Sequence, residues 1–361
     1  MYLLAADVGG TKTIFQIGQL GERDHLAEMR LQSRDFPDFA AMARTFLETI
    51  PEEVRTHIQV ACLAVPGPAV SGDHVLTNLP WKMDSDELEQ SLGIPKVLLI
   101  NDFEGVAWGT SMLSAEDLCI LQVGTTHPTG PILVVGAGTG LGQGVLLRAP
   151  TPRVLASEGG HVDFAPTDPL QFALLQRLQR RYGRVSTERV LAGSGIHELY
   201  VFLLERAQAN NEDKGRQSAQ VSQEVASAVD PAAVIAQHAL AEDDQLCQET
   251  MELFIHIYGA HVGNAALHPI ASGGVYVAGG IAPKILPLIR AGGFMQAFRR
   301  KGRMAALLGE MPVMVVQNTK VGLLGARRYA ELFLNGQVQP EAPAPGYGNL
   351  AAGSAPKKGD S

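Results

Sequence analysis

Apolar residues fall into short runs and periodic stretches that predict alternating strands and helices. The run at residues 2–7 stops at Asp7 and resumes at residues 13–17, which predicts a strand, a glycine turn and a second strand. Apolar residues recur at helical intervals over residues 39–50, so we predict a helix that ends before Pro51. This alternation indicates an α/β fold. Two further strands are predicted at residues 59–65 and 96–100.

The second half of the chain repeats the opening pattern. Strands are predicted at residues 119–123 and 131–135, a glycine-rich turn follows at 136–142, and a strand resumes at 145–147. Two hairpins of one type indicate an internal duplication and two related lobes. Long helices are predicted at residues 169–182 and 245–268, further strands at 274–278 and 313–317, and a closing helix at 321–334.

Two segments lack the composition of a packed element. Residues 207–219 are polar and predict a surface loop. Residues 336–361 are rich in Pro, Ala and Gly, and Val338 and Leu350 are the only aliphatic residues besides alanine. We expect this tail to be disordered, because it buries too little apolar area to offset its ordering entropy.

Composition limits the class of protein more than it identifies a function. The 361 residues are enough for two domains, and the formal charge of −8 gives no sign of a nucleic-acid or membrane partner. It does not argue against ATP either, because phosphates are held by local backbone N–H groups and metal ions. Cys62, Cys119 and Cys247 have no metal-ligand spacing, and the first apolar run is too short for a signal or membrane segment. We expect a cytoplasmic protein.

The first glycine turn has the composition of a phosphate site. Gly9 and Gly10 let the backbone approach a ligand, and Thr11 and Lys12 add donors. Asp7, at the end of the preceding strand, is placed to hold Mg²⁺ through water, since this ion keeps much of its hydration shell. The alternative is a plain glycine hairpin with a capping aspartate.

The second turn, residues 136–144, has glycine at every second position, so one face can lie against a ligand. Its spacing does not match the G-x-G-x-x-G dinucleotide fingerprint, and the chain has no G-x-x-x-x-G-K-[ST] phosphate loop. We predict that the two turns hold the phosphates of a nucleotide from opposite sides. The residues predicted for this in the second turn are Gly136, Gly138, Thr139 and Gly140.

Asn101 and Asp102 follow a predicted strand, where α/β folds place ligand chemistry. Phosphoryl transfer to an alcohol needs a base for the hydroxyl proton, and Asp102 is a candidate. The alternative is that Asp102 caps the helix that starts near Phe103.

Residues 157–163 combine two acids, a histidine and a glycine pair. Glu158 and His161 are candidate acceptors for sugar hydroxyls, with a metal site as the rival interpretation. Glu188 is a further candidate acceptor, or an ordinary first-turn helix acid.

Together these segments resemble the bacterial glucokinase family, a branch of the sugar-kinase, actin and heat-shock-chaperone superfamily that is distinct from the ROK sugar kinases. His161 here is not followed by the cysteines of the ROK zinc motif. The resemblance covers residues 1 to about 334. The matching segments are 7–11, 77–81, 100–103, 136–142, 158–164, 188–191 and 278–281.

The resemblance implies two ribonuclease-H-like lobes of the actin-like ATPase fold with an interlobe active-site cleft. Residues 1–110 and the helix 321–334 would form the small lobe, and residues 111–320 the large lobe. It further implies phosphorylation of glucose by ATP and Mg²⁺, and a homodimer. Asp102 would be the base, Asn101, Glu158, His161 and Glu188 would bind the sugar, and Gly279 and Gly280 would flank the adenosine. A kinase for mannose or an amino sugar, or a non-catalytic sugar sensor, are the alternatives.

Overall fold

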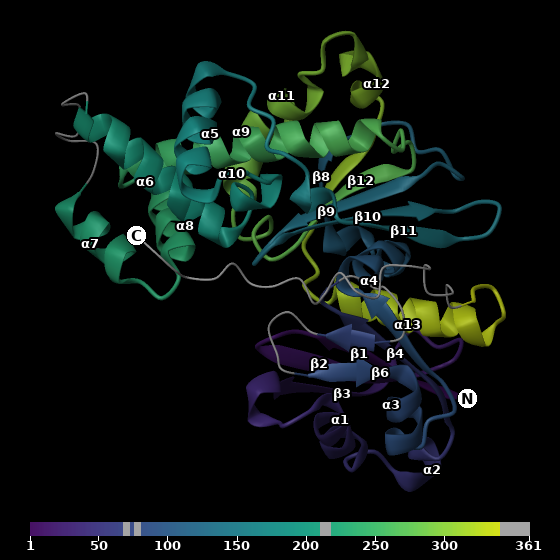
Figure 1. Cartoon of the computed structure of the whole chain (residues 1–361). Coiled ribbons are helices and arrows are strands. Elements are labelled where there is room, and N and C mark those ends of the chain that lie inside the picture. Colours follow the sequence, from purple (N-terminus) through teal and green to yellow (C-terminus); the bar gives the residue numbers. More distant parts are fainter. Residues whose placement is uncertain (68–72, 76–80, 210–217, 340–361) are drawn as a thin grey trace. The chain divides into compact units, whose positions relative to one another are not determined.

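The computed structural model describes residues 1–67, 73–75, 81–209 and 218–339, which form two compact units (Figure 1). The first unit comprises the described residues of 1–113 and 320–339, and by its contacts also Thr151–Ala156, although the strand β11 (Arg153–Ser157) that this segment belongs to pairs in the sheet of the second unit and is given there. The second comprises Ser114–Pro150 and Ser157–Thr319. Most of the matching segment 77–81 lies outside the described residues.

The first unit is built on a five-stranded sheet with the order β3-β2-β1-β4-β7. The central strand β1 pairs antiparallel with β2 and parallel with β4, and β4 pairs parallel with β7. The elements of this unit are β1 (Tyr2–Val8), β2 (Lys12–Gln19), β3 (His25–Gln32), a 3-10 turn (Ser33–Asp35), α1 (Phe39–Leu47), α2 (Glu52–Arg55), β4 (Ile58–Val65), β5 (Asp73–Val75), β6 (Lys82–Asp84), α3 (Ser85–Leu92), β7 (Val97–Asn101), α4 (Asp102–Gly109), a 3-10 turn (Thr110–Met112) and α13 (Val321–Leu334).

Both faces of this sheet are covered by helices. Phe15 of β2 packs against Phe39 and Phe46 of α1, with ring centroids 5.6 and 5.3 Å apart, and all three side chains are buried. Helices α4 and α13 lie together on the opposite face (Figure 1). Because α13 comes from the end of the sequence, the fold of this unit requires both ends of the chain.

The second unit is built on a six-stranded sheet with the order β11-β10-β9-β12-β13-β8. Its strand β9 pairs antiparallel with β10 and parallel with β12, as β1 does with β2 and β4. The elements are a 3-10 turn (Ala115–Asp117), β8 (Leu118–Gln122), β9 (Ile132–Ala137), β10 (Leu141–Leu147), β11 (Arg153–Ser157), the 3-10 turn η4 (Gly159–His161), α5 (Pro169–Tyr182), the 3-10 turn η5 (Thr187–Arg189), α6 (Gly193–Ala209), α7 (Ala219–Ser227), α8 (Pro231–Ala241), α9 (Gln245–Leu267), β12 (Gly274–Ala278), α10 (Leu286–Arg290), α11 (Gly293–Arg299), a 3-10 turn (Gly302–Met304), α12 (Ala305–Gly309) and β13 (Val313–Val316).

The core of the second unit lies between this sheet and α9. Phe254 and Tyr258 of α9 are fully buried, and the Tyr258 ring meets that of Phe294 of α11 edge to face at 5.5 Å. The Tyr258 hydroxyl accepts a hydrogen bond of 3.1 Å from the backbone N–H of Ala137, at the end of β9. Helix α9 is thereby fixed to the strand that leads into the second glycine turn.

The predicted α/β class is confirmed, and the strand, glycine turn and strand are present in both units. The bounds of α5, β12 and α13 are those predicted. The strand β3 was not predicted, although Ala27, Met29 and Leu31 alternate with polar residues and pack against the core. It is an edge strand, and none of its side chains is fully buried.

The two segments that were expected to lack regular structure differ from the prediction at their ends. The loop expected at 207–219 is shorter at both ends, since α6 runs to Ala209 and α7 begins at Ala219. Residues 210–217 lie outside the described residues. The start of the expected tail is packed, because Val338 is buried and the carbonyl of Gln339 accepts a hydrogen bond from Tyr329. The rest of that predicted tail, residues 340–361, also lies outside the described residues.

Candidate active site

The predicted site residues fall into two groups, one in each unit. The first unit contains Asp7, the first glycine turn with Gly9, Gly10, Thr11 and Lys12, and the pair Asn101 and Asp102. The second unit contains the second glycine turn, Glu158, His161, Glu188, and the pair Gly279 and Gly280. Each group is described within its own unit.

The first glycine turn is held by a serine that the sequence did not point to. The Gly9 N–H donates to the carbonyl of Lys12 at 3.0 Å, which closes the turn. Ser33 is fully buried, and its hydroxyl donates to the carbonyl of Gly9 at 2.7 Å, while its backbone N–H donates to the carbonyl of Thr11 at 2.9 Å. Because two carbonyls of the turn are bonded inward, its shape is fixed before any ligand arrives.

Asn101, and not Asp102, caps helix α4. The Asn101 Oδ1 accepts hydrogen bonds from the backbone N–H groups of Phe103 at 2.9 Å and Glu104 at 3.3 Å. Its Nδ2 donates to the carbonyl of Gly67 at 2.8 Å. Asp102 is the first residue of the helix, so the N-cap position belongs to Asn101. The Asp102 Oδ1 also accepts a hydrogen bond of 2.9 Å from the Phe103 N–H, so its carboxylate still contacts the first turn. One amide hydrogen of Asn101 remains for a ligand.

Asp102 lies close enough to Asp7 for the two carboxylates to interact. Burial and, to a smaller extent, the Asp102 carboxylate together raise the pKa of the Asp7 carboxyl to about 6, while Lys12 opposes the shift. The N-terminus of α13 is also close, because a Cβ placed on Gly322 would lie 3.4 Å from the Asp7 Oδ2. Two acids in one partly buried place favour a bound cation.

This arrangement fits Mg²⁺ better than a metal that needs a full protein cage. No group of three or more His, Cys, Asp or Glu side chains in the described ranges of the chain has the geometry of a metal site. Mg²⁺ does not require such a group, since it keeps several waters and takes one or two carboxylates plus substrate phosphates. Asp7 is the residue that fits this role.

In the second unit the predicted sugar acceptors lie together. The His161 Nε2 is 3.7 Å from a Glu158 oxygen, and the His161 Nδ1 is 4.0 Å from the Glu188 Oε1. All three side chains are partly exposed. Glu158 and Glu188 are far apart in the sequence, but they lie close in space because η4 and η5 are neighbours in the fold.

Thr187 ties these two segments to each other. Its side chain is buried, and its hydroxyl lies 3.2 Å from the carbonyl of Val162 and 3.3 Å from that of Asp163. Its backbone N–H donates to the same Val162 carbonyl at 2.8 Å. Thr187 was not singled out from the sequence, where a buried threonine next to a candidate acid carries no distinct signal.

Glu188 also contacts the second glycine turn. Its Oε2 accepts a hydrogen bond of 3.0 Å from the backbone N–H of Leu141. A Cβ on Gly140 would lie 2.6 Å from that same oxygen, so any side chain at this position would displace the Glu188 carboxylate. The predicted sugar acceptors and the predicted phosphate turn are thus one connected arrangement in this unit.

The pair Gly279 and Gly280 adjoins the same turn. The backbone N–H of Ile281 donates to the carbonyl of Ala137 at 3.2 Å, and the N–H of Gly193 donates to the carbonyl of Gly138 at 2.9 Å. The segments predicted to hold the nucleotide are therefore neighbours, although the sequence places them far apart. This gives the second unit a continuous backbone surface of small residues beside three hydrogen-bond acceptors.

The comparison with protein families decides the identity of this arrangement. The family model described as glucokinase matches residues 4–332, nearly the whole described chain. The chain belongs to the glucokinase family. A glucokinase of Nostoc sp. (strain PCC 7120) is 44% identical over 334 residues, which cover 90% of this chain and 97% of that protein.

Solved structures of sugar kinases have the same architecture. The crystal structure of a glucokinase from an Antarctic psychrotroph matches with a TM-score of 0.78 at 30% identity, covering 91% of this chain and 98% of that one. A ROK-family glucokinase from Streptomyces griseus, in complex with glucose and AMPPNP, matches with a TM-score of 0.58 at 20% identity, covering 90% and 98%. The chain has the actin-like two-lobe ATPase fold, as predicted.

Proposed function

We propose that this protein transfers the terminal phosphoryl group of ATP to the 6-hydroxyl of glucose, with Asp102 as the general base. The observation that carries the proposal is membership of the glucokinase family over residues 4–332. The match to the Nostoc glucokinase covers 97% of that protein, so the similarity extends over nearly all of its length.

The chemistry assigned to Asp102 follows from its position. It begins α4 at the end of a parallel strand and lies near Asp7, while its neighbour Asn101 performs the capping. A carboxylate so placed is suited to accept the proton of the attacking hydroxyl as the new O–P bond forms. Its contribution is expected to be about 10²-fold or more in kcat, as for other positioned bases.

The remaining roles are distributed over the two units. Glu158, His161 and Glu188 are proposed to accept hydrogen bonds from sugar hydroxyls, and Asn101 to donate one with its remaining amide hydrogen. The two glycine turns are proposed to bind the phosphates through their backbone N–H groups, with Gly279 and Gly280 beside the adenosine. The proposal requires residues of both units to act on one pair of substrates.

Mg²⁺ is proposed as the cofactor, held by Asp7 through water. When bound, the ion neutralises charge on the phosphate oxygens. The raised pKa of Asp7 supports this assignment, because a cation beside the two acids would favour their ionised forms.

The test of the base assignment uses Asp102→Ala with a matched control in the same helix turn. A coupled assay with glucose and ATP should show kcat reduced at least about 10²-fold, while glucose affinity measured by calorimetry stays within about threefold. Glu104→Gln removes a charge two residues further on and keeps an acceptor for Trp108, so its kcat should stay near that of the wild type. Near-normal turnover of Asp102→Ala would rule Asp102 out as the base.

Substrate choice is tested separately. Comparing kcat/KM for glucose, mannose and glucosamine decides the hexose, and replacing ATP by polyphosphate decides the donor. Glucose and ATP are expected to give the highest kcat/KM. A higher value for another hexose would place that sugar, and not glucose, in front of Asp102.

The assembly and location are also proposals. We expect a cytoplasmic homodimer, as the family resemblance implies, and sedimentation equilibrium of the purified chain tests the dimer. No helix in the part of the chain that the structure describes is long and apolar enough to span a membrane.

A further inference from the structure

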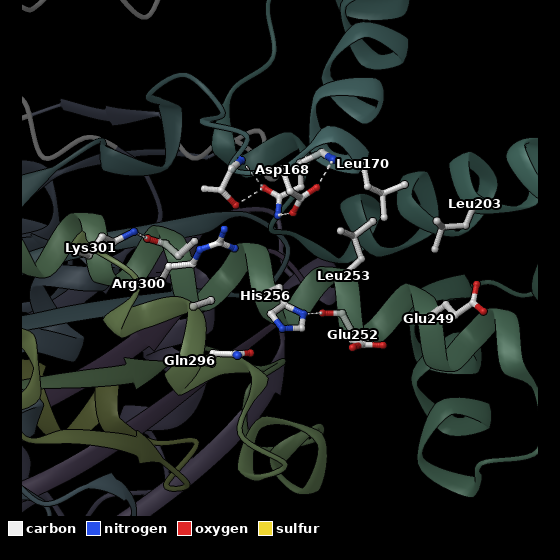
Figure 2. A pocket seen from close by; sticks show the side chains of 14 residues that line it. Asp168, Leu170, Leu203, Glu249, Glu252, Leu253, His256, Gln296, Arg300 and Lys301 are labelled. Atoms are coloured by element: carbon white, nitrogen blue, oxygen red, sulfur yellow. Dashed lines mark hydrogen bonds between the residues drawn. The ribbon is translucent and has the colours of Figure 1, made fainter. Parts of the chain in front are cut away.

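A cavity in the second unit lies apart from every residue assigned above. It has a volume of about 610 Å³ and is lined by the start of α5, one face of α9, α6 and the end of α11 (Figure 2). Leu170, Leu203 and Leu253 form apolar parts of its wall. A volume of this size is in the range of small-molecule sites.

The charges that line the cavity are separated along α9. Arg300 and Lys301 lie at one end, and Glu252 and Glu249 towards the other (Figure 2). The Lys301 Nζ donates to the carbonyl of Ala260 at 2.8 Å. Ala260 and Glu252 are on the same face of α9, about 12 Å apart along its axis at about 1.5 Å per residue.

Among the residues that the structure describes, the basic end has no counter-ion. Within the described ranges, no carboxylate forms an ion pair with Arg300 or Lys301, and the only hydrogen-bond partner of the Lys301 ammonium is a backbone carbonyl. Burial lowers the pKa of the Lys301 ammonium, which is the sign of a cation that has been desolvated without an acid nearby. An anionic group is therefore the complement of this end.

The other charged side chains that line the cavity differ in how many hydrogen-bond partners they have within the protein. Asp168 accepts hydrogen bonds from the backbone N–H and the side-chain Nε2 of Gln171, and Glu249 accepts one from Gln245. The His256 Nδ1 lies 3.0 Å from the backbone carbonyl of Glu252. The Glu252 carboxylate has no such partner among the residues described, so it is the acceptor available for a ligand.

We propose that this cavity binds a sugar phosphate, with its phosphate at Arg300 and Lys301 and its hydroxyls donating to the Glu252 carboxylate. A neutral sugar would leave the basic end without a counter-ion. A ligand with an acid at each end would bring like charges together at Glu252. A phosphate ester with several hydroxyl groups satisfies both ends and the space between them.

The opposite face of α9 is the one that contacts the candidate active site. Two residues before Ala260, Tyr258 bonds the backbone of Ala137 at the start of the second glycine turn. The site proposed here is separate from that turn, and its ligand is inferred from the cavity alone. Its existence does not depend on the role of Asp102.

The test is calorimetric titration of the full chain with glucose 6-phosphate in saturating glucose, which occupies the proposed sugar site. Arg300→Glu is the main variant, because Arg300 is exposed and its side chain makes no hydrogen bond within the described part of the chain. It should weaken binding by about tenfold or more, whereas Arg290→Glu, the same change at an exposed residue of α10 outside the cavity, should change it less than about twofold.

Two further variants test which end of the ligand each side chain binds, and whether this site is distinct from the candidate active site. Glu252→Ala should weaken glucose 6-phosphate and leave inorganic phosphate unchanged. Glu158→Gln, in the candidate active site, should leave the binding intact. Absence of binding to the wild type, or binding that Arg300→Glu does not alter, would overturn the proposal. A wild type that binds through Arg300 but has no kinase turnover would contradict the proposed function and leave this inference standing.

Discussion

Replacing Gly140 by alanine tests whether the second glycine turn and the candidate sugar acceptors work as one arrangement. The new Cβ would lie 2.6 Å from the Glu188 Oε2, nearer than non-bonded atoms approach, so something must move. The carboxylate is the end of a flexible side chain and moves most easily. The backbone of Leu141 would then lose its 3.0 Å hydrogen bond to a charged acceptor.

The size of the effect follows from that single contact. A hydrogen bond to a charged group contributes about 1.5–3 kcal/mol, which corresponds to roughly tenfold to a hundredfold in kcat/KM if the displaced groups bind substrate. KM for glucose is expected to rise because Glu188 moves, and KM for ATP because the turn shifts. The melting temperature is expected to fall by only a few degrees, since no buried backbone clash is created.

The assay is steady-state kinetics with each substrate varied in turn, beside thermal unfolding. Gly309→Ala is the matched control, because a Cβ there meets nothing within 4 Å, and its kinetics should match those of the wild type. Shortening Glu188 to aspartate should relieve the clash, so the double variant Gly140→Ala, Glu188→Asp should lose less than the sum of the two single variants. A kcat/KM for Gly140→Ala within twofold of the wild-type value would refute the reasoning.

Three further predictions concern stability. Because the folded-state pKa of Asp7 is raised to about 6 from 3.8, its ionisation opposes folding as pH rises between these values. Without Mg²⁺, Asp7→Asn should raise the free energy of unfolding by on the order of 2–3 kcal/mol at about pH 7.5 and little at about pH 3.5; equal effects at both pH values would contradict this. His238 Nδ1 lies 2.8 Å from Asp243, which raises the His238 pKa, so this stabilisation is present below about pH 6.5 and lost as pH rises through the folded value. His238→Gln should therefore lower the melting temperature more at about pH 6 than at about pH 9, and the reverse order would refute it. Arg327 is buried and ion-paired, so Arg327→Met should lower the free energy of unfolding in urea by about 3–5 kcal/mol. The control is Arg328→Met at a half-exposed position, which should lower it by under about 1 kcal/mol. Similar losses for the two variants would show that burial is not the cause.

The elements with strong local signals could be predicted from the sequence. Helix α5 begins at Pro169 with Asp168 as its cap, and α13 shows a continuous apolar stripe, so both were located with their bounds. The two glycine turns stood out because glycine and threonine are uncommon at strand ends in that density. Periodicity and turn chemistry are properties of neighbouring residues, and neighbouring residues are what a sequence displays.

The sequence predicted which residues belong to the candidate site, but not the hydrogen bonds that connect them. Glu158, His161 and Glu188 were named from composition and family resemblance, whereas their support by Thr187 was not. Ser33 bonds to Gly9 across 24 positions, and Glu188 to Leu141 across 47. Such contacts are set by which strands pair and which loops adjoin, and no periodic pattern records them.

Asn101 and Asp102 separate most clearly what the sequence determined from what the tertiary structure decided. The sequence determined that two polar residues end a buried strand and begin a helix. Which one caps the helix depends on where the strand ends. Asn101 is still paired with Val65 of β4, so its backbone is extended and its side chain takes the capping position, while Asp102 becomes the first helical residue near Asp7. The register between two strands, a long-range contact, thus sets the position of the proposed base.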